Sequence, residues 1–320
     1  MRPVSFLPFA IALVTALPAA AGPLIDADSL ETRLQDSDLA IIDIRNDIDG
    51  GSLETFAKGH VPGAVYSNYL QAGWRTVVDG VVGMTPGIDV LEALIGNLGI
   101  GNDDDVVIVH GGVGPSDFGS AARVYWTFRY LGHDRVSILD GGYNAWIADP
   151  SRPLETGEVV VTEPDIFDAD IRPGLLVTTE EVAASLNDPK TVRIDARPEK
   201  QYRGEEKHGK ALAAGRIPGS IGVEQAVFFG DDGRLLPREV LESLVPDAVS
   251  SGEADLVISY CNTGHWAATN WFVLSEMLGY HRVRLYDGSM TGWTADVSRP
   301  VSTGADPLDV IGRWLADPTG

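Results

Sequence analysis

Cysteine is almost absent from this chain of 320 residues, in which Cys261 is the only one. A single cysteine excludes an internal disulfide framework and the cysteine clusters of structural zinc sites. The six histidines form no close pair on a predicted helix and no Cys-His spacing typical of a metal site. We therefore expect neither a metal ion nor any other cofactor.

Basic residues are scarce as well. The chain has 24 lysines and arginines against 46 aspartates and glutamates, which gives a formal net charge of −22. This charge disfavours nucleic acid and an anionic membrane surface as partners, because both would be repelled. An anionic substrate would need a locally positive site.

Long apolar runs are missing after the first 21 residues. Within them, Arg2 precedes an uncharged, mostly apolar run from 4 to 17, and three alanines follow at 19–21. A spanning helix needs about 20 apolar residues, and prolines interrupt this shorter run. The pattern predicts a signal peptide at 1–21 and a periplasmic or secreted protein, with no membrane insertion after cleavage. Amino-terminal sequencing that finds a start at or near Gly22 would support this prediction.

The remaining sequence repeats at a period near 150 residues. In order, residues 41–45 match 192–197, 59–64 match 215–220, 106–110 match 256–260, and 138–142 match 285–289. We therefore expect two copies of one domain, at 22–157 and 175–302. An extended linker at 158–174 joins them, and a tail follows at 303–320.

Each copy alternates short apolar segments with amphipathic ones. That alternation predicts an α/β fold in which each copy has a parallel sheet with helices on both faces. Strands are predicted near 192–196, 256–260 and 283–287. Helices are predicted at 89–98, at 179–186 with Thr178 or Thr179 as cap, at 237–245 with Pro237 in the first turn, and at 267–278.

Cys261 lies between the predicted strand at 256–260 and the predicted helix at 267–278. A thiol in this position faces unpaired backbone N–H groups and the positive end of the helix dipole, and both favour the thiolate. The thiolate is the nucleophilic form of cysteine. The alternative is an inert cysteine buried as a small hydrophobe. In an oxidising compartment a lone cysteine cannot form an internal disulfide, so we favour a reactive thiol.

Together, these features resemble the two-domain rhodaneses, which are thiosulfate or 3-mercaptopyruvate sulfurtransferases. The resemblance covers roughly residues 25–302 and rests on the tandem repeat, the Pro-Gly motif after the first strand, the strand–Cys–loop–helix and the Tyr-Asp-Gly-Ser-Met-Thr-Gly-Trp segment. It implies that Cys261 takes sulfane sulfur from a small-molecule donor, holds it as a persulfide and passes it to cyanide or a thiol. A protein acceptor fits the same chemistry. In the first copy, Gly111 aligns with Cys261, so the resemblance implies that this copy is inactive and that its glycine-rich loop at 111–119 is structural.

The loop after Cys261 is expected to turn N–H groups toward the sulfur, and Gly264 allows a backbone conformation that other residues resist. Three residues depart from the family pattern, one of which is Trp266 in place of a usually smaller or basic residue. Gln201 stands where an arginine often binds the donor, and Thr263 stands where thiosulfate-type loops have lysine. Lys207 and Lys210 are further candidate cations. The predicted loop residues are Asn262, Thr263, Gly264, His265 and Trp266, and the predicted donor-binding residues are Arg197, Gln201 and Arg216.

Three questions stay open at this stage. His265 either acts as a cation or base beside the thiolate or points outward from the loop, and we favour the second interpretation. A non-catalytic sulfur carrier or binding module is one alternative function. A cysteine phosphatase-like enzyme is less favoured, because that chemistry needs an arginine six residues after the cysteine, where Ala267 stands.

Overall fold

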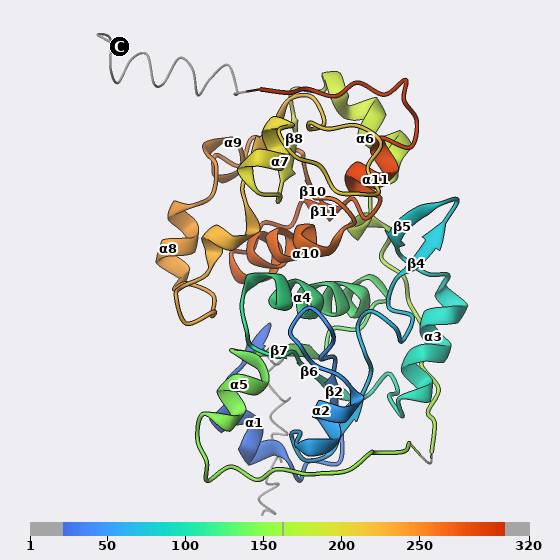
Figure 1. Ribbon diagram of the computed structural model, residues 1–320, viewed down its shortest axis with the longest axis vertical. Coiled ribbons are helices and arrows are strands. Elements are labelled where there is room, and N and C mark those ends of the chain that lie inside the picture. Colours follow the sequence, from blue (N-terminus) through green and yellow to red (C-terminus); the bar gives the residue numbers. More distant parts are fainter. Residues whose placement is uncertain (1–21, 162, 305–320) are drawn as a thin grey trace, which may run out of the picture.

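The computed structural model describes residues 22–161 and 163–304 (Figure 1). Two α/β units lie one above the other in this view, the first coloured blue to green and the second yellow to red. The predicted signal peptide lies outside the described residues, as does the predicted tail apart from residues 303 and 304. In the described part of the chain, no helix has both the length and the apolar character needed to cross a membrane.

The first unit contains a five-stranded sheet whose paired strands are all parallel. Its central strands read as continuous apolar runs because helices cover both faces of the sheet. The strand order is β1 (Leu24–Ile25), β7 (Val136–Leu139), β6 (Asp105–Val109), β2 (Leu39–Asp43) and β3 (Ala64–Tyr66).

The second unit repeats this arrangement with four parallel strands, ordered β11 (Val283–Leu285), β10 (Leu256–Tyr260), β8 (Thr191–Asp195) and β9 (Ser220–Gly222). The three strands predicted here are confirmed, although β8 begins one residue early and β11 ends two residues early. A separate antiparallel hairpin, β4 (Thr76–Val78) with β5 (Val81–Met84), projects from the first unit toward the second.

Helices cover both faces of each sheet, as the alternation predicted. On the first sheet, the helices of one face are α1 (Ala27–Arg33), α2 (Leu53–Lys58) and α5 (Gly142–Ile147), and those of the other are α3 (Ile88–Asn97) and α4 (Pro115–Tyr130). On the second, α6 (Thr179–Ala184) and α11 (Ser289–Trp293) face α8 (Arg238–Ser243), α9 (Asp247–Ser250) and α10 (His265–Trp271) across the sheet. The short helix α7 (Glu199–Arg203) follows β8.

The predicted helices are confirmed with shifted ends. Thr178 caps α6 through a capping box with Glu181, and Pro237 directly precedes α8. The helix predicted at 267–278 begins two residues earlier, because the chain turns at Gly264. Its second half, η4 (Phe272–Met277), is a π-helix, which the apolar pattern did not indicate.

The segment predicted as a linker follows the surface of the first unit as an extended chain, apart from a short 3₁₀ turn at Pro173–Leu175 (Figure 1). It is anchored by Phe167, which is buried and lies 6.1 Å from Phe128 between ring centroids. The linker is thereby packed against the unit that it leaves.

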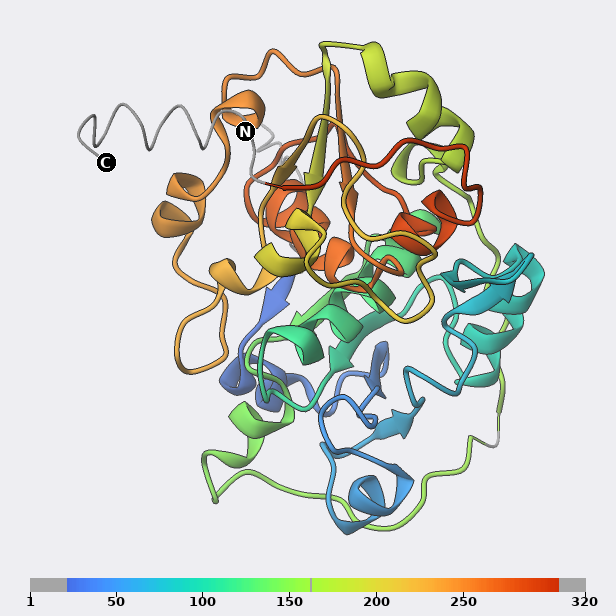
Figure 2. The ribbon, with the colours of Figure 1, turned by 45° about the horizontal axis from the view of Figure 1, so that its top comes forward.

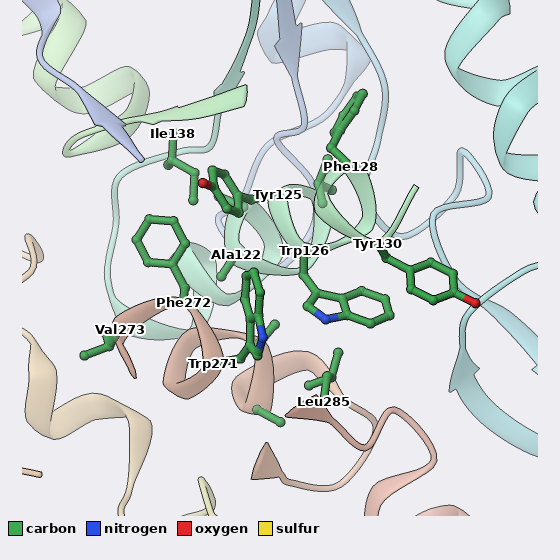
Figure 3. Packing of buried hydrophobic residues seen from close by; sticks show 14 of the residues in the cluster. Ala122, Tyr125, Trp126, Phe128, Tyr130, Ile138, Trp271, Phe272, Val273 and Leu285 are labelled. Atoms are coloured by element: carbon green, nitrogen blue, oxygen red, sulfur yellow. The ribbon is translucent and has the colours of Figure 1, made fainter. Parts of the chain in front are cut away.

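The two units share one hydrophobic core where α4 packs against α10 (Figures 1 and 2). Phe272 lies edge-on to Tyr125 at a centroid distance of 4.9 Å (Figure 3), and edge-on to Phe118 at 5.5 Å. Aromatic pairs in this geometry add to the stabilisation from apolar burial. Cys261 and the start of α10 therefore lie at the junction of the two units.

Candidate active site

Cys261 is buried directly after β10, and the loop that follows it enters α10 at His265. The turn is made at Gly264, whose φ of +71° lies in the left-handed region. A side chain there would also collide with Arg123 of the first unit. The need for glycine at this position is confirmed.

Ser289 holds the loop in place, and the sequence analysis missed it. Its hydroxyl accepts the N–H groups of Cys261 and Gly264 at 3.0 and 3.1 Å and donates to the Tyr286 carbonyl. Two donors that we expected to face the sulfur are thus used to hold the loop. Ser289 has a φ of +47°, a strained conformation for a residue other than glycine. The signal in the sequence was that Gly142 takes this place in the first copy, with a φ of +59°.

Gln201 reaches the loop through Asn262, whose side-chain N–H₂ donates to Oε1 of the Gln201 side chain at 2.8 Å. Thr263 is half-buried beside the hairpin of the first unit, where its carbonyl and Cβ lie against Gly83. Gln201 thus orients a loop residue, while Thr263 forms part of the contact between the units.

Arg197 does not line the pocket beside Cys261, and its guanidinium is already bound. It pairs with Asp195 through two nitrogens and donates to the Gly215 carbonyl at 2.8 Å. In the first unit, which has no cysteine, Arg45 repeats this arrangement with Asp43 and the Gly59 carbonyl. Because the arrangement occurs without the thiol, we assign Arg197 a structural role, and these contacts give no support to the predicted donor-binding one.

The other candidate cations are also engaged or exposed. Arg216 is buried over the Tyr202 ring and donates to the Gly304 carbonyl at 2.9 Å, so it anchors the end of the described chain. Lys207 is exposed and donates to the Ala211 carbonyl, and Lys210 is exposed. None of these three side chains lines the pocket beside Cys261.

His265 does not point outward, contrary to our expectation. It is buried between the units, with Nδ1 2.9 Å from the Tyr69 hydroxyl and Nε2 2.8 Å from the Ser116 carbonyl. A carbonyl only accepts hydrogen bonds, so Nε2 carries the proton and Nδ1 accepts from Tyr69. Burial, together with the charge of Arg75, lowers the pKa of His265 to about 3. His265 is therefore a neutral contact between the units, and neither a cation nor a solvated side chain.

Trp266 joins the same contact, because its indole N–H donates to the Ser116 hydroxyl at 3.0 Å. Ser116 lies in the first turn of α4, at the end of the glycine-rich loop of the first unit. That loop therefore supports the loop of Cys261 directly, which agrees with the structural role that we expected for it.

Arg123, on α4, is a buried cation at the base of the loop. Its guanidinium donates to the carbonyls of Gly264 and Gly83 at 3.2 and 3.3 Å. Its only carboxylate partner in the described part of the chain, Asp287, is 3.8 Å away. The Arg123 charge interacts with Cys261, so the first unit supplies positive charge beside the thiol.

A pocket of about 190 Å³ opens beside Cys261. Residues of both units line it, and among these described residues none carries a carboxylate. The first unit provides Ile48 and Arg75, and the second provides His208, Cys261, Asn262, Thr263, His265 and Trp266.

The strand register corrects the sequence alignment of the nucleophile. Val109 pairs with Asp43, as Tyr260 pairs with Asp195, so the residue that follows each strand is His110 in one unit and Cys261 in the other. The match of 106–110 to 256–260 had placed Gly111 opposite the thiol, one residue too late, and the first loop is one residue longer before its helix. The first unit still has no cysteine.

The loop of the first unit surrounds a carboxylate of its own. Asp117 accepts the N–H groups of Gly112 and Val113 at 2.6 and 3.1 Å, and its Oδ2 lies 2.7 Å from Nδ1 of His110. Burial alone would raise the pKa of Asp117, but His110 and the loop N–H groups outweigh burial and hold that pKa well below its usual range. The loop in this fold can therefore stabilise a negative charge. In the second unit, Ala267 stands at the position of Asp117 and carries no carboxylate.

Asp49 lies beside this cluster and gives the protein a testable pH dependence. Burial and the charge of Asp117 raise the pKa of Asp49 to about 7. A raised pKa means that the folded state holds the proton more tightly, so this contribution to stability is present below about pH 4 and is lost as pH rises toward 7.

We expect Asp49→Asn, which mimics the protonated carboxyl, to remove this loss. Its urea midpoint, measured relative to that of the wild type, should rise between about pH 5 and about pH 8. Asp79→Asn, on the exposed hairpin turn, is the control. Parallel curves for wild type and Asp49→Asn would contradict the assignment of the proton to Asp49.

In the described part of the chain, no group of three or more His, Cys, Asp or Glu residues is placed to hold a metal ion. The geometry near Cys261 is instead that of a single buried thiol beside arginine side chains from the other unit.

Comparison with known proteins gives consistent matches over most of the chain. The family described as "Rhodanese-like domain" matches residues 26–149 and 178–296, one match to each unit. A probable 3-mercaptopyruvate sulfurtransferase of Pseudomonas aeruginosa is 33% identical over 88% of this chain and 98% of its own length. The sulfur carrier protein TtuD of Thermus thermophilus is 29% identical over 88% of this chain and 97% of its own.

Solved structures match both units together. SseA from Escherichia coli, described as a 3-mercaptopyruvate sulfotransferase, is 26% identical with a TM-score of 0.71, over 84% of this chain and 99% of its own. An anaerobic ergothioneine biosynthesis enzyme from Chlorobium limicola has a TM-score of 0.74 over 89% of this chain and 71% of its own, and at 22% identity it shows only that the fold is shared.

Proposed function

This chain belongs to the rhodanese family of sulfurtransferases, and on that premise we propose that it carries sulfane sulfur as a Cys261 persulfide from a small anionic donor to a thiophilic acceptor. The observation that carries the proposal is the setting of Cys261, a buried thiol in a loop held by Ser289 and facing a pocket between the two units. The first unit acts as a scaffold for that loop.

The reaction proceeds in two half-reactions. The Cys261 thiolate attacks the outer sulfur of the donor, the donor's bond to that sulfur breaks, and the electron pair leaves with the donor remnant. With thiosulfate the remnant is sulfite, and with 3-mercaptopyruvate it is the pyruvate enolate, which takes up a proton. The acceptor then attacks the outer sulfur of the persulfide, and the thiolate returns as leaving group.

The loop and the first unit support the charged states of sulfur. Both thiolate and persulfide are anions, and the Arg123 charge and the amino end of α10 stabilise anions at this position. The bound carboxylate of Asp117 in the first unit is an internal example of the same type of loop around an anion.

A sulfur carrier with little turnover on small acceptors is the second candidate function. The similarity to the sulfur carrier protein TtuD favours it, and so does the use of Gln201 to bind Asn262 rather than a donor. A carrier would form the same persulfide but pass the sulfur to a protein partner.

Initial rates with a panel of donors and cyanide as acceptor separate the two candidates. For an enzyme with a covalent intermediate we expect ping-pong kinetics, with parallel double-reciprocal lines for thiosulfate, 3-mercaptopyruvate or both. A persulfide that forms in one stoichiometric burst and is not turned over by cyanide would identify the carrier.

We also propose that the mature protein works outside the cytoplasm, on the pattern of residues 1–21. Native protein found in a cytosolic fraction with Met1 intact would overturn this part of the proposal.

A further inference from the structure

The pocket beside Cys261 is positively charged, although the protein as a whole is acidic. One residue supplies the positive charge that the pocket keeps at neutral pH. The whole chain carries −22, yet the lining of the pocket includes Arg75 and no carboxylate. His208 also lines it, but burial and the neighbouring lysines lower the pKa of His208. At neutral pH the fixed positive charge of the pocket wall is therefore that of Arg75, which belongs to the unit without the thiol.

Arg75 is held in place by an aromatic ring, and its Nε–H group has no hydrogen-bond partner among the described residues. Its guanidinium lies over the Tyr69 ring, 4.5 Å from the centroid. Tyr69 in turn donates to His265, the residue that begins α10. The Nε atom of Arg75 is buried, and within residues 22–161 and 163–304 it has no hydrogen-bond partner. A buried, unpaired N–H is costly unless a ligand satisfies it.

We infer that Arg75 is the donor-binding residue of this protein and that it pairs with the carboxylate or sulfur oxyanion of a small donor whose outer sulfur lies against Cys261. The inference rests on the proposed function and specifies its substrate class. It also accounts for the departures in the second unit, where Arg197 and Arg216 are bound to other groups and Gln201 is uncharged. In this protein the positive charge that binds the donor is therefore supplied by the first unit.

The volume of the pocket limits the donor. A space of about 190 Å³ is below the range of about 300–1,000 Å³ of typical drug-sized sites, so it fits a donor of a few heavy atoms. Thiosulfate and 3-mercaptopyruvate both meet the limits of size and charge.

The test compares wild type with Arg75→Gln, Arg75→Lys and the control Arg282→Gln in the full chain. Arg282 changes the net charge equally, but it lies on the exposed surface of the second unit, paired with Asp255. We expect Arg75→Gln to raise KM for both anionic donors by at least about tenfold, the loss of one charge-assisted hydrogen bond, with a smaller change in kcat. Arg75→Lys should recover most of this loss, because it keeps the charge.

A second measurement does not depend on sulfur transfer. Iodoacetate and iodoacetamide alkylate the same thiol and differ in charge, so the ratio of their rates at Cys261 reports the cation in the pocket. We expect Arg75→Gln to lower the iodoacetate-to-iodoacetamide ratio about tenfold, while Arg282→Gln leaves it unchanged.

The two measurements separate the inference from the proposed function. If no donor is turned over but the ratio falls in Arg75→Gln, the anion site stands and the sulfurtransferase proposal fails. If donors are turned over while KM and the ratio of Arg75→Gln match the wild type, or if Arg282→Gln raises KM and lowers the ratio as much as Arg75→Gln does, Arg75 is not the donor-binding residue.

Discussion

Cys261→Ser is expected to abolish sulfur transfer and to leave the protein unable to gain mass from any sulfur donor. In the wild type, donor without acceptor should add one sulfur atom, about 32 Da, to the intact protein, because the thiolate is capped as a persulfide. Cyanide should then remove this mass. A serine hydroxyl forms no persulfide, so the variant should stay at its own mass in every reaction.

We expect Cys261→Ser to keep the wild-type fold, so that the two proteins differ only in the reactive group. Cys261 and serine are close in size, and the loop is held by backbone groups through Ser289, so the thermal midpoint of Cys261→Ser should stay near that of the wild type. Unchanged wild-type mass with thiosulfate, 3-mercaptopyruvate and persulfide donors, while the thiol remains titratable, would end the sulfurtransferase proposal.

Arg123→Met should damage both stability and activity, although Arg123 belongs to the unit without the cysteine. The substitution leaves the Gly264 and Gly83 carbonyls without their donor and Asp287 without its cation. Loss of one partner of a buried charge pair costs about 3 kcal/mol, and we expect a decrease of that size in the free energy of unfolding from urea titration.

The expected loss of activity in Arg123→Met is larger than instability alone would give. Removing one fixed electrostatic contact at a reacting centre typically costs about a hundredfold in rate, and we expect this fall in kcat/KM at a temperature where the variant is folded. Arg129→Met is the matched control on the same helix. Arg129 is only partly buried and pairs with the exposed Asp134 and the partly buried Glu276, so Arg129→Met should lose less stability than Arg123→Met and keep its activity. Equal kcat/KM values for the two variants would refute the role of Arg123.

The repeat predicted the fold well, because its residues act through interactions with near neighbours in the sequence. Capping by Thr178, the start of α8 after Pro237 and the turn at Gly264 depend on a few neighbouring positions, and each is found. The loop of the first unit was misaligned by one residue, because 106–110 were matched to 256–260 on apolar character alone, whereas Val109 and Tyr260 have the same register in their sheets.

The site was only partly predictable, because half of it comes from the other unit. Cys261 and its loop stand together in the sequence, but Arg75, Tyr69 and Arg123 are far from them along the chain, and nothing in local spacing connects them. The interpretation of Arg197 was limited for the opposite reason, because its contact with Asp195 is local. Arg197 sits in a motif that the family resemblance associates with donor binding, yet it pairs with Asp195, two residues away, and with the Gly215 carbonyl, and the equivalent Arg45 shows that this arrangement needs no thiol.

The packing of α4 on α10 also bears on how such a chain can evolve. After a tandem duplication, a copy that has lost its thiol is normally free to decay or to be deleted. Here that copy's helix has become one half of its neighbour's interior, with Phe118 and Tyr125 against Phe272. Deleting it would expose these rings to water, so natural selection for the thiol of one copy also preserves the other, and the pair is inherited as a single unit.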